Sequence, residues 1–214
     1  MRKLAIFDFD GTLVDSVHDV IISFNKALEI HDFPTLTREE YLDRLGGNID
    51  EIVSLILKDN NSPENIEILK GTYEEIYYSS QNNLTCPFPD VHQLLKSLQE
   101  KRILLAINSN RKNDSLEVYV ERFFSDINFV SIEGQIQDNP SKPSPFAVNR
   151  IMEKYNLAKK DCIYIGDSIT DIRTAQNAGI DCLLVSWGYG RSNAFESDYP
   201  IEVIDNTSEI LKYF

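Results

Sequence analysis

The feature that most constrains the fold is a series of short apolar runs that recur along the chain without polar alternation. A strand with one face in water alternates apolar and polar residues, whereas a strand buried on both faces of a parallel sheet does not. Segments of helical periodicity lie between most of the runs, at residues 91–100, 115–124, 145–155 and 169–178. The runs themselves are residues 3–9, 102–107, 129–132, 162–165, 181–185 and 202–204. This alternation predicts an α/β core, a doubly wound (Rossmann-like) parallel sheet.

One long interval, residues 16–83, breaks the alternation because it carries helix signals and no convincing strand. Four helices are more than a single crossover connection uses, so we expect an all-helical cap inserted into a catalytic core of residues 1–15 and 84–214. A long crossover packed on the sheet is the alternative. The helix signals are a helical period at 17–30, a capping-box pattern at 37–40, an apolar period at 49–57 and the start signal Ser62-Pro63-Glu64.

Charge and cysteine usage exclude several classes of function. The 214 residues include 34 Asp and Glu against 21 Lys and Arg, a formal net charge of −13. Such a chain repels phosphate backbones and anionic lipid, so we expect neither nucleic acid nor a membrane as a partner. An anionic substrate would need a local reversal of charge, by a metal or a few cations. The three cysteines form no CxxC pair, and no segment suits a bilayer span or a signal peptide, so we expect a cytoplasmic protein.

Two aspartates follow the first apolar run. Asp8 and Asp10 are two residues apart, so in an extended strand their side chains leave the same face. Gly11 then ends the strand, which places both carboxylates at the carboxyl edge of the sheet, where open α/β folds bind ligands. Asp-Gly is also a common turn dipeptide, but an acid within an apolar run is rare unless it is paired.

A second pair of acids, Asp167 and Asp171, follows the run at residues 162–165. Acids that converge from two strand ends repel one another unless a cation lies between them. A hard divalent cation with oxygen ligands removes this repulsion, and Mg²⁺ suits a site that also binds phosphate. The alternative is that the segment Gly166–Asp171 is an ordinary strand-to-helix cap.

Two further sites fit an anion at the same edge. Ser109 and Asn110 follow an apolar run and offer a hydroxyl and backbone N–H groups, although a serine there can also be a helix cap. Lys142 stands just before a predicted helix, with Pro143 at or near its first turn. A lysine there opposes the helix dipole, which is tolerable on the surface or useful beside a cluster of acids and a phosphate.

Taken in this order, the four segments resemble the motifs of the haloacid dehalogenase superfamily of phosphotransferases. Its first motif is matched by DFDGTLVDS at residues 8–16, its second by Ser109-Asn110, its third by Lys142-Pro143 and its fourth by GDSITD at residues 166–171. The resemblance covers the whole chain, including a helical cap between the first two motifs.

The resemblance implies roles that spacing alone does not. Asp8 would be the nucleophile that takes the phosphoryl group, and Asp10 the general acid and then the base. Mg²⁺ would be held by the Asp8 carboxylate, the Asp10 backbone carbonyl and Asp167, with Asp171 supporting them. Phosphoryl oxygens would be bound by Ser109, Asn110 and Lys142.

Within the superfamily, the chain resembles phosphoglycolate phosphatases and related pyrophosphatases. The resemblance implies a phosphatase of a small phosphorylated metabolite; a pyrophosphatase or a sugar phosphomutase on the same scaffold is the alternative, and Gly166 counts against the mutase. A non-catalytic anion- or partner-binding domain is a rival of another class. The candidate substrate contacts, each of which could equally be an exposed polar residue, are Arg44, Gly47, Asn48 and Arg111. The sequence does not indicate the oligomeric state.

Overall fold

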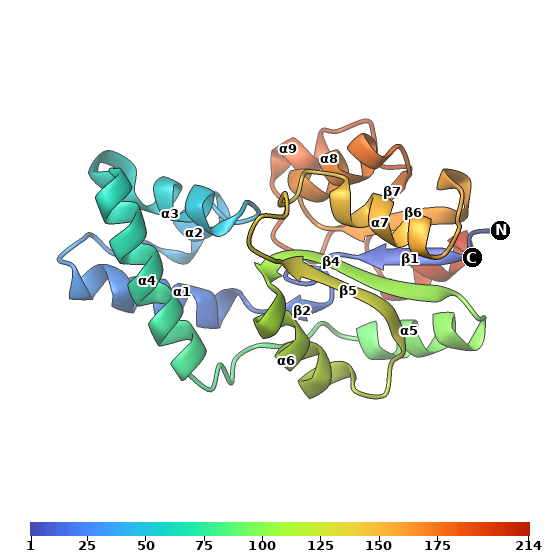
Figure 1. Cartoon of the computed structure of the whole chain (residues 1–214), viewed down its shortest axis with the longest axis horizontal. Coiled ribbons are helices and arrows are strands. Elements are labelled where there is room, and N and C mark those ends of the chain that lie inside the picture. Colours follow the sequence, from blue (N-terminus) through green and yellow to red (C-terminus); the bar gives the residue numbers. More distant parts are fainter. The chain divides into compact units, whose positions relative to one another are not determined.

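Six strands form one sheet in the order β5-β4-β1-β6-β7-β8, and every neighbouring pair of strands is parallel (Figure 1). Their bounds are β1 (Leu4–Phe7), β4 (Leu104–Lys112), β5 (Phe129–Gln135), β6 (Cys162–Gly166), β7 (Asp181–Val185) and β8 (Glu202–Ile204). The order runs outward from β1 in both directions, which is the doubly wound arrangement. The predicted α/β fold class is confirmed.

Helices cover both faces of this sheet: α5 and α6 lie on one side in Figure 1, and α7 and α8 on the other. The helical segments are α5 (Val91–Glu100), α6 (Asn113–Phe124), α7 (Phe146–Lys154), α8 (Ile169–Ala178), α9 (Ser192–Phe195) and α10 (Thr207–Ile210), with 3-10 turns η2 (Lys159–Asp161) and η3 (Leu211–Tyr213). Leu4 and Ile6 pack in one cluster with Val148 of α7 and Ile172 of α8. Because every residue of β1 is fully buried, the apolar run has no polar alternation.

The computed structural model describes residues 1–214, which divide into two compact units. One consists of Met1–Asp15 with Pro87–Phe214, and the other is Ser16–Cys86. The chain passes between them at two short strands, β2 (Val14–Asp15) and β3 (Cys86–Pro87), which pair with each other.

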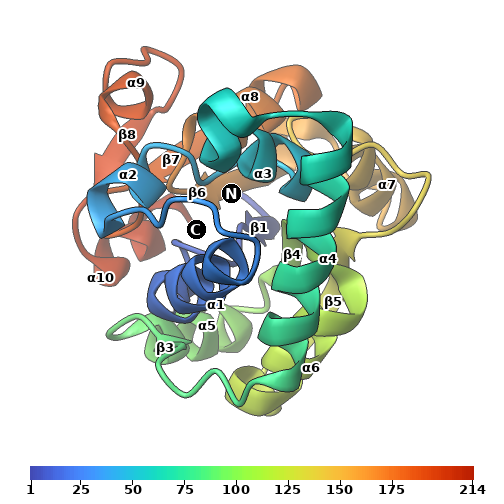
Figure 2. The same cartoon turned by 90° about the vertical axis from the view of Figure 1, so that its left-hand side faces the viewer.

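The unit Ser16–Cys86 is helical (Figure 2). Its helices are α1 (Val17–Ile30), α2 (Arg38–Leu42), α3 (Ile49–Leu57) and α4 (Pro63–Ser79), with the 3-10 turn η1 (Lys58–Asn60). The predicted capping box is present, since the Thr37 side chain accepts from the Glu40 N–H and Glu40 accepts from the Thr37 N–H. The α1 and α4 helices pack together, and the ring of Phe24 stacks on that of Tyr73 with centroids 3.7 Å apart. No helix of the protein combines the length and apolar character that a membrane crossing requires.

Three expected boundaries were wrong: two strand ends and one helix start. The first strand stops at Phe7 and not at residue 9, because Thr12, Leu13 and Val14 all donate backbone N–H groups to the Phe9 carbonyl in a tight turn. Asp8 and Asp10 therefore lie beyond the strand.

The other two boundaries concern the second and third motifs. The β4 strand continues to Lys112, five residues beyond the predicted end at 107, because it goes on pairing with β5. Ser109 and Asn110 are thus strand residues and not helix caps. Lys142 is in a loop, since α7 begins only at Phe146 with Pro145 as its N-cap residue. Lys142 was predicted to stand just before the helix, with Pro143 at or near its first turn, but Pro143 lies three residues before the first residue of α7.

Asn25 holds the helical unit together by three hydrogen bonds, and its replacement gives a prediction for stability. The Asn25 side chain accepts from the Leu36 N–H and the Tyr41 hydroxyl and donates to the Leu36 carbonyl. We expect Asn25→Ala to lower the free energy of unfolding by about 1–3 kcal/mol, since these groups lose their partner. Urea unfolding followed by circular dichroism measures the change. Lys26→Ala, at an exposed position of the same helix, is the control, and equal stability of the two variants would contradict the assignment.

Candidate active site

The register of the sheet brings the predicted motifs to one edge. Phe7 of β1 is level with Ile107 of β4 on one side and with Ile165 of β6 on the other. The residues that follow these three positions therefore emerge next to one another at the carboxyl ends of the central strands. This is the edge at which doubly wound folds bind ligands.

Three buried carboxylates meet there. Asp8, Asp167 and Asp171 each offer an oxygen, and these oxygens all lie within 4.8 Å of one another. Burial, together with the charge of Asp171, raises the pKa of Asp8 well above its ordinary value. The same two causes raise the pKa of Asp167 to about 7. Removal from water and mutual repulsion both oppose ionisation of the three carboxyl groups. A cation beside them would relieve both effects.

Lys142 is the cation that the chain itself supplies. Its Nζ atom lies 2.6 Å from Asp8 Oδ1 and 2.7 Å from Asp171 Oδ1, and the residue is only 6% exposed. Burial alone would lower the pKa of Lys142, but the charges of Asp171 and Asp8 outweigh it and raise the pKa well above its ordinary value. Lys142 is therefore a charged ammonium between two acids, separated from them by 134 and 29 residues in sequence.

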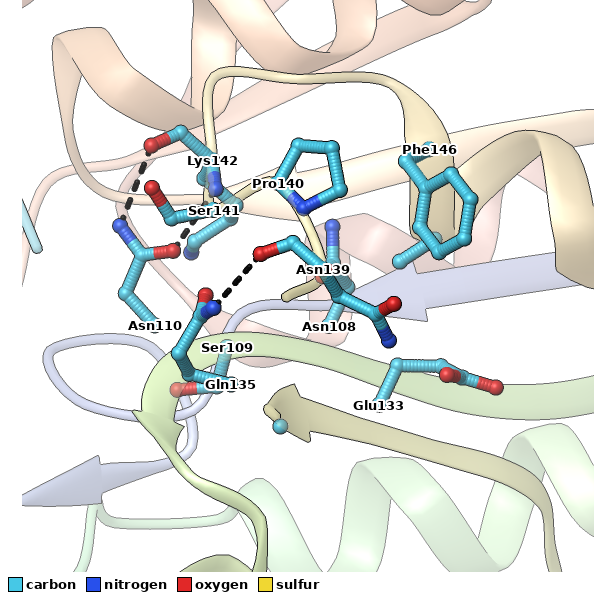
Figure 3. Close-up of a pocket in the computed structure, with 12 residues that line it drawn as sticks. Asn108, Ser109, Asn110, Glu133, Gln135, Asn139, Pro140, Ser141, Lys142 and Phe146 are labelled. Carbon is cyan, nitrogen blue, oxygen red and sulfur yellow. Dashed lines mark hydrogen bonds between the residues drawn. The ribbon is translucent and has the colours of Figure 1, made fainter. Parts of the chain in front are cut away.

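Asn110 fixes the backbone of Lys142. Its Oδ1 atom accepts from the Lys142 N–H at 2.8 Å, and its Nδ2 atom donates to the Lys142 carbonyl at 3.3 Å (Figure 3). The Asn110 side chain thus holds the loop that carries Lys142, and binding of phosphate by Asn110 stays a prediction. Ser109, which is buried, accepts from the Arg111 N–H through Oγ at 3.1 Å.

Ser109, Asn110 and Lys142 also line a cavity of about 20 Å³, which Figure 3 shows. The Nδ2 atom of Asn108, another lining residue, is buried and has no hydrogen-bond partner. A cavity of this size holds about one water molecule, which would satisfy that amide.

Asp167 is surrounded by close backbone contacts. It accepts from the Thr12 hydroxyl at 3.3 Å and from the Tyr189 N–H at 2.7 Å. Gly11, with φ +88°, stands so close that a Cβ atom there would lie 2.5 Å from Asp167 Oδ2, and one on Gly188 would overlap the Asp167 side chain. Sequence reasoning missed Thr12 and Tyr189; for Tyr189, the glycines on either side of it were the available signal of a close approach.

Asp171 is both a helix cap and a member of the acid cluster, which were the two alternatives for the segment Gly166–Asp171. Its Oδ2 atom accepts from the N–H and the hydroxyl of Ser168, completing a capping box at the start of α8. Its Oδ1 atom accepts from Lys142. The helix cap thus orients the acid that faces the lysine, and the cap interpretation does not exclude a functional one.

Asp10 lies outside the three-acid cluster and has a cation of its own. Arg111 donates from Nε to Asp10 Oδ2 at 3.0 Å and from Nη2 to Asp10 Oδ1 at 2.5 Å. A guanidinium that contacts both oxygens in this way forms a directional, charge-assisted pair. We expected Arg111 to contact substrate, and the spacing gave no sign of its pairing with Asp10.

The residues of the helical unit that were predicted to contact substrate all lie next to helix ends. Arg44 donates to the backbone carbonyls of Glu40 and Leu55. Asn48 is the N-cap of α3, where its side chain accepts from the Glu51 N–H. A Cβ atom on Gly47 would lie 2.5 Å from Oε2 of Glu51, the carboxylate of the capping box at the start of α3. Contact of these residues with a substrate stays a prediction.

The donor set of the cluster fits a hard cation. Its members offer only carboxylate oxygens, with no cysteine or histidine among them. Oxygen ligands of this kind suit Mg²⁺ in preference to Zn²⁺ or copper. Together with Lys142, such a cation would offset the charge of the three carboxylates, so that a phosphorylated substrate is not repelled by a chain of net charge −13.

Comparison with known proteins gives one family throughout. The sequence model of the haloacid dehalogenase-like hydrolase family matches residues 5–185. The chain is 28% identical to the phosphoglycolate phosphatase of Vibrio parahaemolyticus over 216 residues, covering 98% of this chain and 95% of that protein. It is 29% identical to the phosphoglycolate phosphatase of Vibrio cholerae over 221 residues, covering 98% and 96%.

Solved structures share the fold of this chain over nearly its whole length. A crystal structure from Lactobacillus delbrueckii, of a protein inferred to be a phosphoglycolate phosphatase, superposes with a TM-score of 0.91 at 25% identity and covers 98% of this chain and 97% of that one. A haloacid dehalogenase-like hydrolase from Streptococcus pneumoniae superposes with a TM-score of 0.88 at 22% identity, covering 100% and 98%, and shares the fold.

The raised pKa of Asp167 predicts how stability depends on pH when the protein is free of metal. The folded chain releases this proton near pH 7, whereas the ordinary value for the unfolded chain is 3.8. Between these values the folded state binds more protons, so the free energy of unfolding falls as the pH rises. Thermal unfolding in EDTA is expected to show Asp167→Asn losing less stability than wild type between about pH 4.5 and about pH 8. The control is Asp198→Asn at an exposed site; a common slope for all three proteins would refute the buried-charge account.

Proposed function

Since the chain belongs to the haloacid dehalogenase-like hydrolases and is a phosphoric monoester hydrolase, we propose that it is a Mg²⁺-dependent phosphatase of a small phosphoglycolate-like phosphomonoester, acting through an aspartyl-phosphate. The observation that carries the proposal is the contact of Lys142 with Asp8 inside the buried cluster of acids. The choice of substrate is supported by the curated relatives, which are phosphoglycolate phosphatases.

In the first step, an Asp8 oxygen attacks the phosphorus of the ester. The bond between Asp8 and phosphorus forms as the bond to the leaving oxygen breaks, and Asp10 gives that oxygen its proton, which releases an alcohol. Lys142 and Ser109 bind the phosphoryl oxygens, and Asn110 fixes the loop of Lys142 through its backbone. This assignment uses the acid outside the cluster for proton transfer and the acid beside the lysine for attack.

In the second step, Asp10 takes a proton from water, whose oxygen attacks the phosphorus and displaces Asp8. Inorganic phosphate leaves, and both aspartates return to their initial state, so atoms and protons balance. Asp8, Asp167 and the Asp10 backbone carbonyl would hold Mg²⁺, with Asp171 behind them. When bound, that cation neutralises charge on the phosphoryl oxygens and orients them for in-line displacement.

Gly166 favours the proposed phosphatase over a sugar phosphomutase on the same scaffold. The resemblance to mutases would require a glutamate at this position, but even a Cβ atom there would overlap the side chain of Asp171. Asp171 is fixed by its helix cap and by Lys142, so it cannot move aside cheaply. The geometry therefore favours hydrolysis over isomerisation.

A panel of phosphorylated compounds tests the function. Purified protein with Mg²⁺ is expected to release phosphate from phosphoglycolate faster than from pyrophosphate or hexose phosphates, and to form no hexose phosphate isomer. Because the cluster of acids needs a cation to hold a phosphate, EDTA is expected to abolish the activity and added Mg²⁺ to restore it. Phosphate release and product analysis provide the measurements. Activity that ignores chelation would exclude the metal, and faster pyrophosphate cleavage would make the protein a pyrophosphatase.

Replacing Asp8 tests the covalent route. We expect Asp8→Asn to lower kcat roughly a thousandfold or more, since the amide is a poor nucleophile, while the fold is kept because a buried repulsion is relieved. Steady-state kinetics and circular dichroism measure the two effects. Asp198→Asn, which changes an exposed aspartate of the same unit, should behave as wild type. Turnover retained by a folded Asp8→Asn protein would rule out attack by Asp8.

A further inference from the structure

Arg111 is tied to the proposed proton donor by two bonds at once. Its Nε and Nη2 atoms donate to the two different oxygens of Asp10, at 3.0 and 2.5 Å, across 101 residues of sequence. Two parallel bonds from a planar guanidinium fix both the distance and the plane of a carboxylate. A single-point contact from a lysine would leave that plane free to rotate.

Arg111 is itself held rigidly. Its Nη1 atom donates to the Ser115 hydroxyl at 3.1 Å, and its guanidinium lies over the ring of Tyr119, 4.7 Å from the centroid. The arginine side chain is 8% exposed, whereas the side chain of Asp10 is 29% exposed. The arginine is therefore the buried partner of the pair, and Asp10 is the more accessible one.

The arrangement leaves Asp10 able to exchange a proton. Each carboxylate oxygen has two lone pairs, and the guanidinium takes one on each oxygen. The positive charge also stabilises the negative charge that Asp10 acquires as it gives its proton away.

We propose that Arg111 is a positioning residue, which holds Asp10 by both oxygens in the orientation from which Asp10 passes its proton to the leaving oxygen. The inference rests on the proposed phosphatase function and adds to it the residue that aims the general acid. It also gives Arg111 a different role from the substrate contact expected from the sequence, because it assigns three of its side-chain hydrogen bonds to Asp10 and Ser115.

The dependence on the leaving group distinguishes this role from a structural one. Poor leaving groups need the proton of Asp10, whereas p-nitrophenolate hardly does. We expect Arg111→Met, which keeps the length and apolar packing of the side chain, to lower kcat/KM for alkyl phosphates roughly ten- to hundredfold. For p-nitrophenyl phosphate the change should stay within about threefold. Arg122→Met, which replaces an exposed arginine on the following helix α6, is the matched control and should affect neither substrate.

A double-mutant cycle with Asp10→Asn completes the test. If Arg111 acts through Asp10, adding Arg111→Met to Asp10→Asn should change kcat/KM for alkyl phosphates by less than about threefold. An undiminished effect in the Asp10→Asn background, or a loss confined to substrates with a second anionic group, would overturn the proposal and make Arg111 a substrate contact. Wild-type behaviour of Arg111→Lys on alkyl phosphates would overturn the two-point hold.

The outcomes also separate this inference from the proposed function. A wild-type protein that hydrolyses no phosphomonoester would refute the phosphatase and the role of Arg111 together. An active wild type with additive effects in the cycle would refute only the role of Arg111. Circular dichroism and thermal melts of each variant show that the comparison is made between folded proteins.

Discussion

The ammonium of Lys142 between Asp8 and Asp171 is the interaction on which the site depends. Oxygens of three buried acids lie within 4.8 Å of one another and repel, and burial weakens the screening that bulk water would give. Lys142 offsets part of this charge, but one ammonium does not neutralise three carboxylates. The remaining negative charge gives the cluster its affinity for a further cation. In the proposed mechanism the same lysine binds a phosphoryl oxygen, so that one side chain would meet both a structural and a chemical demand.

The backbone around the cluster is built to keep these charges in place. Asn110 clamps the loop of Lys142, Ser168 caps the helix that carries Asp171, and the Tyr189 N–H fixes Asp167. Gly11 and Gly188 pass so close to Asp167 that no side chain fits at either position. The free-energy cost of burying the acids is thus offset by several short-range contacts. These contacts come from segments that lie far apart in the sequence.

Much of the fold, and the set of acids, could be predicted because the signals are local. A strand buried on both faces is continuously apolar, and an acid directly after it must lie at the sheet edge, as Asp8 and Asp167 do. The pairing of Arg111 with Asp10 and the contact of Tyr189 with Asp167 could not be predicted, since each depends on how distant loops approach. The extension of β4 through Ser109 was missed because its residues are polar, and pairing with β5 decides it.

The two cations of the site illustrate why arginine and lysine are not interchangeable. In the proposed mechanism Asp8 approaches phosphorus, and the compact ammonium of Lys142 contacts only one of its oxygens. In the same proposal Asp10 keeps a fixed orientation while it loses and regains a proton, and the planar guanidinium of Arg111 contacts both of its oxygens. Exchanging the two cations would then free the acid that the proposal needs oriented and restrain the acid that it needs to attack. The roles proposed for the two aspartates thus match the shape of the cation beside each.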